Sequence, residues 1–120
     1  MMHLDSQEIC SSIVECYPYP IVFADTSHTI RYLNRAARYH YYEERGHADL
    51  VGRSIFDCHQ RETSRTKIEN YLEFFQKDSK ELFLGLSDRN LRIYVAPVRN
   101  AEGTLIGYYE RFELNLQKGS

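Results

Sequence analysis

Asp57, Cys58 and His59 stand together and supply a carboxylate, a thiol and an imidazole, the side chains of nucleophilic catalysis. Catalysis requires these groups to converge on one point, whereas neighbours in a chain point in different directions. We therefore interpret their adjacency as coincidence and predict neither a catalytic site nor an enzyme. Zinc binding is equally weakly indicated, because adjacent residues rarely bind one ion and no second Cys/His pair lies near.

These residues follow the segment Leu50–Ser54, in which apolar residues lead into Gly52, a residue that tolerates unusual backbone angles. Ser54 stands as a helix N-cap, and Asp57 completes a capping box. The pattern predicts a turn and one short helical turn, with Cys58 and His59 at its exit. Two strands and a helix are predicted before this segment, and a long helix and three strands after it. We expect it to form one wall of a pocket.

The composition is that of one globular domain: 120 residues, 42% hydrophobic and 27% charged. The 15 basic and 17 acidic residues give a net charge of −2, without the basic patch that a nucleic-acid partner requires. With no long apolar run and no signal-peptide pattern, we expect no membrane span. Three cysteines without a CxxC pair favour a reducing, cytoplasmic location.

The N-terminal segment begins with an acidic capping box at Asp5 and Glu8. An apolar stripe follows at helical spacing, formed by Ile9, Ile13, Cys16 and Tyr17. Pro18 and Pro20 end the helix. A helix of about three turns is marginal alone in water, so the stripe is expected to pack on the sheet or on a second copy of the chain.

The next elements are two short strands, over 21–24 and 29–33, that turn chemistry joins into a hairpin. Asn34 is placed to cap a second helix, predicted over about 35–45 and ended by Gly46.

The strongest helix signal begins at Thr63 or Ser64. Its apolar residues recur at positions i, i+3, i+4 and i+7, namely Ile68, Tyr71, Leu72 and Phe75. Three strands separated by polar turns follow, over 81–86, 91–98 and 104–116. The order of elements predicts an α+β fold with an antiparallel sheet.

This order, with the residues at its joints, resembles a PAS domain. Three stretches carry the resemblance: Pro20–Ala37, with its asparagine and alanines at the helix start, Leu50–Ser54, and the final hairpin from Val95–Val98 through Glu102, Gly103 and Gly107. The resemblance runs from about Tyr17 to about Asn115. It implies a five-stranded antiparallel sheet in the order 2-1-5-4-3 with flanking helices, to which this chain adds an N-terminal helix.

The resemblance implies a sensory or protein-interaction module of a bacterial signalling protein, acting on an effector domain or protein. We expect residues 1–17 to form a dimerisation helix, 18–116 the PAS domain and 117–120 a tail. Ile9, Ile13, Cys16 and Tyr17 are the predicted contacts of a homodimer. A small-molecule or redox signal would alter the sheet and reorient this helix. A ligand-free dimerisation module stays open.

Members of the family bind haem, flavin, small metabolites or nothing. The flavin photoreceptors need an Asn-Cys-Arg-type motif, which the sequence around Cys58 lacks, so flavin is not expected. Haem needs a neutral imidazole aimed into an apolar pocket. His59 is the candidate axial ligand, with His40 and His47 as alternatives, although family members usually place this ligand on the long helix. The cofactor is left undetermined, with haem as an alternative.

The pocket between the long helix and the sheet has eight predicted lining residues, Phe56, His59, Ile68, Leu72, Phe83, Ile93, Val95 and Tyr108. The same side chains would equally fill this space and leave a packed core. If a ligand binds, tyrosine hydroxyls and Glu110 or Arg92 would orient it.

Overall fold

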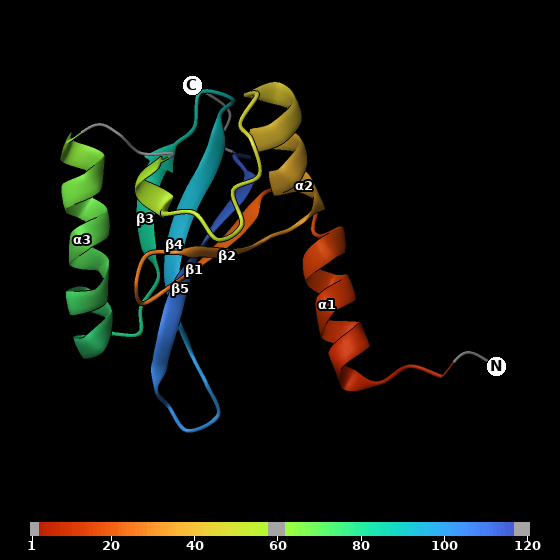
Figure 1. The fold of residues 1–120 in the computed structure, drawn as a ribbon, viewed down its shortest axis with the longest axis horizontal. Coiled ribbons are helices and arrows are strands. Elements are labelled where there is room, and N and C mark those ends of the chain that lie inside the picture. Colours follow the sequence, from red (N-terminus) through yellow and green to blue (C-terminus); the bar gives the residue numbers. More distant parts are fainter. Residues whose placement is uncertain (1–2, 58–61, 117–120) are drawn as a thin grey trace.

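A computed structural model describes residues 3–57 and 62–116 of the chain. A five-stranded antiparallel sheet in the order β2-β1-β5-β4-β3 forms its centre (Figure 1). The strands are β1 (Ile21–Asp25), β2 (Ile30–Leu33), β3 (Leu82–Leu86), β4 (Leu91–Arg99) and β5 (Leu105–Leu114). The predicted fold class and strand order are confirmed.

The central strand β5 approaches β1 so closely that one position requires glycine. A Cβ atom added at Gly107 would lie 2.2 Å from the carbonyl oxygen of Ala24 and 2.7 Å from the ring of Phe23. Backbone cannot yield by that much without disturbing the pairing of β1 with β5.

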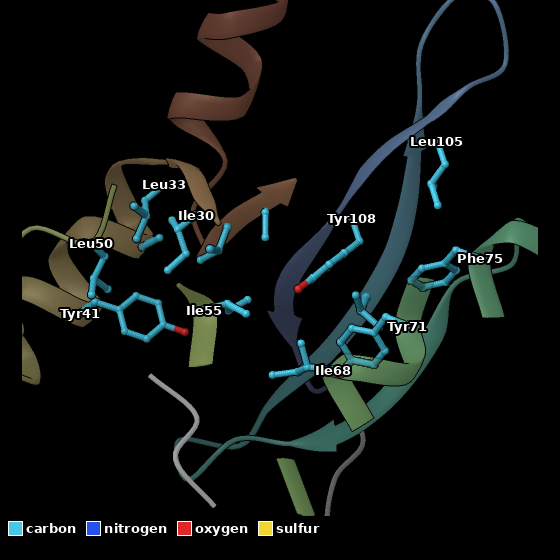
Figure 2. Close-up of a cluster of buried hydrophobic side chains, with 14 residues drawn as sticks. Ile30, Leu33, Tyr41, Leu50, Ile55, Ile68, Tyr71, Phe75, Leu105 and Tyr108 are labelled. Atoms are coloured by element: carbon cyan, nitrogen blue, oxygen red, sulfur yellow. The ribbon is translucent and has the colours of Figure 1, made fainter. Parts of the chain in front are cut away.

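The long helix α3 (Glu62–Lys77) lies along one side of the sheet (Figure 1). Three residues of the predicted stripe are buried, Ile68, Tyr71 and Phe75. Figure 2 shows them turned toward β4 and β5. Burial of each such side chain contributes about 1.5–3 kcal/mol of transfer free energy, which attaches α3 firmly.

The N-terminal helix α1 (Ser6–Cys16) is attached differently, since none of its residues is buried. Its predicted cap is present: the Glu8 amide donates to Asp5 Oδ1 at 2.7 Å. The helix projects on the side of the sheet opposite α3 (Figure 1). The radius of gyration, 15.2 Å, accordingly exceeds the roughly 13.6 Å expected of a compact chain of this length.

The second helix changes type along its length. It is α-helical only over α2 (Arg35–Arg38) and continues as a π-helix, η1 (Tyr39–Glu44), where the Arg45 amide bonds to the His40 carbonyl five residues back. The wider turn brings Tyr41 into the core, with 7% of its surface exposed. Isolated π-turns are rare and frequently mark functional sites.

The predicted turn around Gly52 is present, with a positive φ of 88° at that glycine. Its amide donates to the Ile30 carbonyl at 2.7 Å, which fastens the turn to the outer edge of β2. Ser54 Oγ accepts a hydrogen bond from the Phe56 amide and opens the short 3-10 helix η2 (Ile55–Asp57).

Candidate functional site

Five of the eight predicted lining residues meet between α3 and the sheet. Ile68, Val95 and Tyr108 are buried in the core, and Figure 2 shows Ile68 and Tyr108 turned into it. Phe56 and Leu72 are partly buried against the same cluster.

Phe83 lies on the other face of β3. Because side chains alternate along a strand, Leu82 and Leu84 pack against the core, whereas 52% of Phe83 is exposed. The guanidinium of Arg92 lies 4.8 Å above the Phe83 ring. Phe83 therefore contacts Arg92 outside the packed core, and it also lines an open hollow of about 360 Å³ beside α3, together with Tyr71.

The space enclosed between the sheet and the helices is small. The internal cavity measures about 10 Å³, and its lining includes Val22, Ile30, Tyr41, Leu50, Ile55 and Glu110. That volume is about the size needed for one water molecule. In this conformation, side chains fill the centre of the fold.

Glu110 stands at the centre of the sheet, where it faces the apolar side. It pairs with Val22 on β1 and with Val95 on β4, both of which are buried, and only 6% of Glu110 is exposed. Within residues 3–57 and 62–116, no hydrogen bond or ion pair reaches its carboxylate. Burial raises the pKa of Glu110 to about 7 because the charged form loses its hydration.

Beyond Glu110 the interior opens into a larger space, which we call the η1 pocket. It measures about 440 Å³, and its lining includes His40, Tyr41, Arg89, Ile93, Glu110 and Phe112. The walls come from η1, from the turn between β3 and β4, and from β4 and β5. The volume falls in the range of small-molecule sites, about 300–1,000 Å³.

The mouth of the η1 pocket carries charges. Arg89, in the turn between β3 and β4, forms an ion pair with Glu44 of η1, and His40 Nδ1 lies 3.3 Å from Glu44 Oε1. The guanidinium of Arg45 lies 6.0 Å from the centre of the Tyr41 ring. Charged groups thus ring the entrance, while Glu110 lies at the inner end.

Two tyrosines share the electrostatic environment of Glu110. Burial raises the pKa values of Tyr71 and Tyr108, and the charge of Glu110 raises them further. The Tyr108 hydroxyl is 2.8 Å from His28 Nδ1, and burial lowers the pKa of this histidine. Both tyrosines therefore keep their protons, as hydrogen-bonding groups beside the carboxyl.

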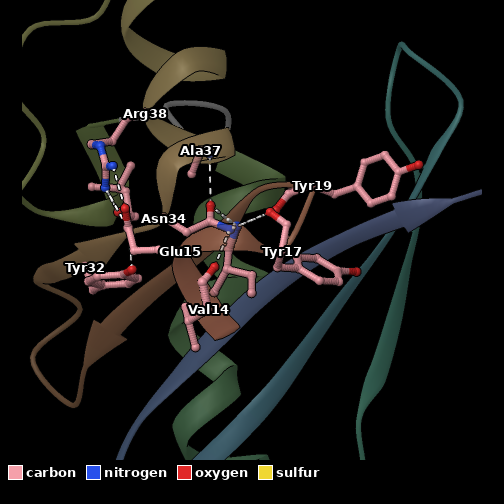
Figure 3. Close-up of polar contacts among 10 residues, drawn as sticks. Val14, Glu15, Tyr17, Tyr19, Tyr32, Asn34, Ala37 and Arg38 are labelled. Atoms are coloured by element: carbon pink, nitrogen blue, oxygen red, sulfur yellow. Dashed lines mark hydrogen bonds and ion pairs between the residues drawn. The ribbon is translucent and has the colours of Figure 1, made fainter. Parts of the chain in front are cut away.

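A second constellation joins α1 to the sheet through the completely buried Asn34, which Figure 3 shows at its centre. Its Oδ1 accepts from the amides of Ile21 and Ala37 at 2.9 and 3.0 Å. Its Nδ2 donates to three backbone carbonyls in and after the last turn of α1, those of Val14, Tyr17 and Tyr19. Sequence reasoning identified Asn34 only as a helix cap.

An ion pair reinforces this joint. Arg38 donates to both oxygens of Glu15 at 2.9 and 2.8 Å, and the Tyr32 hydroxyl donates to Glu15 at 2.5 Å (Figure 3). The hydrogen bonds from Arg38 and then Tyr32 lower the pKa of Glu15 to about 2. Burial and the bond to Glu15 raise the pKa of Tyr32 to about 12. At neutral pH, Glu15 is therefore ionised and Tyr32 is protonated.

The predicted dimer contacts differ in their surroundings. Ile9 and Ile13 are 44% and 65% exposed, and Cys16 is exposed as well. Tyr17 is half-buried, and its hydroxyl donates to the Phe112 carbonyl of β5 at 2.6 Å. Tyr17 thus serves the attachment of α1 within one chain.

A groove of about 720 Å³ runs between α1 and the outer face of the sheet. Its lining includes Cys10, Val14, Phe23, Tyr32, Val98 and Tyr109 and is mostly apolar. The groove lies on the face of the sheet opposite to Glu110.

The described residues do not fit a haem, because the internal cavity of about 10 Å³ leaves no room for the macrocycle. His40 is engaged with Glu44, and His47 lies beside the Tyr41 ring, 6.2 Å between ring centres. Cys58 and His59 lie outside the described residues. Within the described ranges, no three His, Cys, Asp or Glu side chains gather as metal ligands would, and no helix has the length and hydrophobicity to cross a membrane.

Comparison with known proteins agrees with this architecture. No curated protein sequence matches the chain. A C-terminal domain from Streptococcus mutans aligns with a TM-score of 0.64 at 20% identity, over 93% of this chain and 90% of its own. The PAS domain of the histidine kinase ThkA gives 0.58 at 21%, over 78% and 95%.

A third similar structure is that of the Aer2 receptor from Vibrio cholerae, described as a dual PAS-haem oxygen sensor. It gives a TM-score of 0.56 at 19% identity, over 78% of this chain and 91% of its own. At such identities these likenesses support the fold. A family model described as PAS domain matches residues 11–113, nearly the whole chain. The chain therefore belongs to the PAS domain family.

Proposed function

We propose that this chain is the signal-input module of a bacterial signalling protein and that it relays a small-molecule or redox signal through a homodimer. The observation that carries the proposal is the joint at Asn34, where one buried amide connects the end of α1 to β1 and α2. A helix held by polar bonds, with no buried side chain of its own, is suited to change position.

The route between pocket and helix is short. Glu110 lines the η1 pocket, and two residues further along β5 the carbonyl of Phe112 holds the Tyr17 hydroxyl. A ligand that shifts this part of β5 acts directly on the bond that anchors α1. The relay is a population shift between two placements of α1, driven by a ligand with different affinities for them.

The fold neighbours support a signalling context, since one is the PAS domain of a histidine kinase and another a sensor receptor. We infer a non-catalytic module that acts on an effector domain or partner protein. The free, exposed thiols of Cys10 and Cys16 are suited to the reducing bacterial cytoplasm.

The dimer is tested at the exposed face of α1. We expect the chain to be a dimer in sedimentation velocity and Ile13→Glu to be a monomer, because a charge replaces an apolar side chain that is 65% exposed in one chain. Gln7→Glu is the matched control, since it adds the same charge about 120° around the helix from Ile13, where the side chain lines the groove between α1 and the sheet. A monomeric wild type, or an Ile13→Glu variant that stays dimeric, would contradict the proposal.

A contact module without a ligand is the second candidate, and the filled centre of the fold favours it. Such a module would also form the dimer and contain the joint at Asn34, but it would bind no ligand in the η1 pocket. Ligand titration of that pocket therefore separates the two candidates.

A further inference from the structure

The inner end of the η1 pocket holds an unpartnered acid. Glu110 is more than nine-tenths buried, and it lines both the small internal cavity and the open pocket. No hydrogen bond or ion pair to its carboxylate occurs among residues 3–57 and 62–116. Its oxygens are nonetheless open to the pocket, because no fully enclosed side-chain oxygen or nitrogen of the described residues lacks a partner. A donor that enters the pocket can therefore reach a carboxylate that has no donor from the described residues.

We propose that the η1 pocket binds a small protonated amine, whose ammonium group donates to Glu110. The inference rests on the proposed ligand-binding function and adds the chemical class of the ligand. The ammonium would complete the coordination that Glu110 lacks, and the pocket volume of about 440 Å³ admits a small molecule.

The walls of the pocket suit a cation with an apolar body. Tyr41, Phe112 and His40 present rings around the approach to Glu110. Aromatic faces attract cations, and their apolar surface accepts methylene groups. The π-helix η1 provides two of these rings, which gives a role to its irregular geometry.

The charges at the mouth are consistent with this choice. Arg89 is already paired with Glu44, and Arg45 lies over the Tyr41 ring. An anion that passed them would meet the carboxylate of Glu110 at the inner end, without a buried cation to offset it. A cation meets a partner there instead.

The pH dependence of binding follows from the groups around Glu110. Tyr71 of α3 and Tyr108 of β5 face it, Tyr41 lies beside it on η1, and the β1 and β4 neighbours are Val22 and Val95. His40, Glu44, Arg45, Asp88 and Arg89 charge the mouth. Burial gives Glu110 a pKa of about 7, so an ammonium binds the ionised form and loses affinity as the pH falls.

The test is a titration followed by backbone amide NMR of the full chain. Butylammonium is the probe, with butyrate and butanol as matched probes of opposite and no charge. We expect butylammonium alone to shift the amides of Tyr41, Ile93 and Phe112, with saturation by about 10 mM for a Kd of about 1 mM. Affinity should fall about fivefold from pH 7 to pH 6 and about tenfold for the next unit.

Glu110→Gln should weaken butylammonium binding at least about tenfold and remove its pH dependence. Glu113→Gln, a change on the outer face of the same strand, should leave both unaltered. If Glu110→Gln does not fold, the pH titration is repeated with His40→Gln, and a pH dependence that this variant retains is assigned to Glu110, whereas one that it loses overturns the assignment. Binding that is independent of pH between 5 and 7, or a pH dependence that persists in Glu110→Gln, overturns the assignment.

The three probes distinguish a failure of this inference from a failure of the proposed function. Butyrate or butanol shifting the same amides while butylammonium does not would overturn the amine and leave a ligand-binding sensor. No shift with any probe would overturn the amine and favour the contact module, whose dimer the Ile13→Glu experiment tests independently.

Discussion

The helices α1 and α3 lie on opposite sides of the sheet and are attached to it by different forces. Three side chains of α3, Ile68, Tyr71 and Phe75, are buried in the core, whereas α1 buries none. Polar bonds through Asn34, Glu15 and Tyr17 hold α1 instead. Apolar burial is non-directional and is lost only when the core opens, whereas a few directed bonds can exchange partners singly. The comparison therefore distinguishes α3, which is fixed to the sheet by the core, from α1, which can change its position.

The largest effect is expected on the α3 side. Phe75→Ala should lower the free energy of unfolding by about 3–5 kcal/mol, because a fully buried ring leaves a cavity under the helix. Urea denaturation measures the change. Phe74→Ala, at the neighbouring position that is 36% exposed, should lower it by about 1 kcal/mol or less. Equal losses for the two variants would mean that α3 is not held by its buried face.

The next largest effect is the pH dependence of the unfolding free energy, which Glu110 in the sheet is expected to cause. The raised pKa of Glu110 means that its protonated form stabilises the fold below about pH 4.5 and that this contribution is lost as the pH rises through about 7. The contribution of Glu110 to the unfolding free energy should fall by about 3 kcal/mol over that interval. His28, whose pKa burial lowers, contributes in the opposite direction below about pH 6.5. Glu15, with its pKa lowered, contributes in the opposite direction below pH 4.5, outside this interval.

Denaturation at several pH values checks this expectation. Glu110→Gln should remove the Glu110 contribution from the profile, while Glu113→Gln, whose parent carboxylate pairs with Arg111 at 2.7 Å, should retain it. A Glu110→Gln profile that runs parallel to that of the wild type from pH 4.5 to pH 8 would show that water already reaches the Glu110 carboxylate.

The smallest effect on the unfolding free energy is expected at the α1 joint. The same change should have the largest effect on the local opening of a single helix. Asn34→Ala should lower the unfolding free energy by about 2 kcal/mol, because it leaves backbone groups around a buried site unpaired. Hydrogen exchange should accelerate throughout α1 and stay unchanged in α3. Asn70→Ala, an exposed position on α3, is the control. Equal acceleration of hydrogen exchange in both helices would contradict the distinction between a fixed α3 and a movable α1.

Much of this architecture was predictable from the sequence, where local chemistry and periodicity agree. The capping box at Asp5, the stripe of α3 and the polar turns of the meander each depend on residues close in the chain. The five-stranded order came from the resemblance and is confirmed.

The site was less predictable, because its parts meet only in space. The helix predicted over 35–45 continues beyond Arg38 as the π-helix η1, and a periodicity of 3.6 residues cannot locate Tyr41 in it. Phe83 was assigned to the pocket, whereas the structure places it half exposed at an open hollow beside α3, because side chains alternate along β3. Asn34 was recognisable as a cap, but its bonds to Val14 and Tyr19 depend on how the loop after α1 folds back.

The turn around Gly52 has a consequence for self-association. In the described part of the chain, the turn exchanges backbone hydrogen bonds with Ile30 and forms a bridge between Thr29 and Ser54, so it covers the beginning of the outer edge of β2. Among residues 3–57 and 62–116, no strand lies beyond the opposite edge, β3, and a bulge between Phe83 and Gly85 interrupts it. Open edges are templates for strand addition, which bulges discourage. With one edge partly covered and the other interrupted by a bulge, neither edge offers a full-length template for an added strand, which disfavours growth of a fibril.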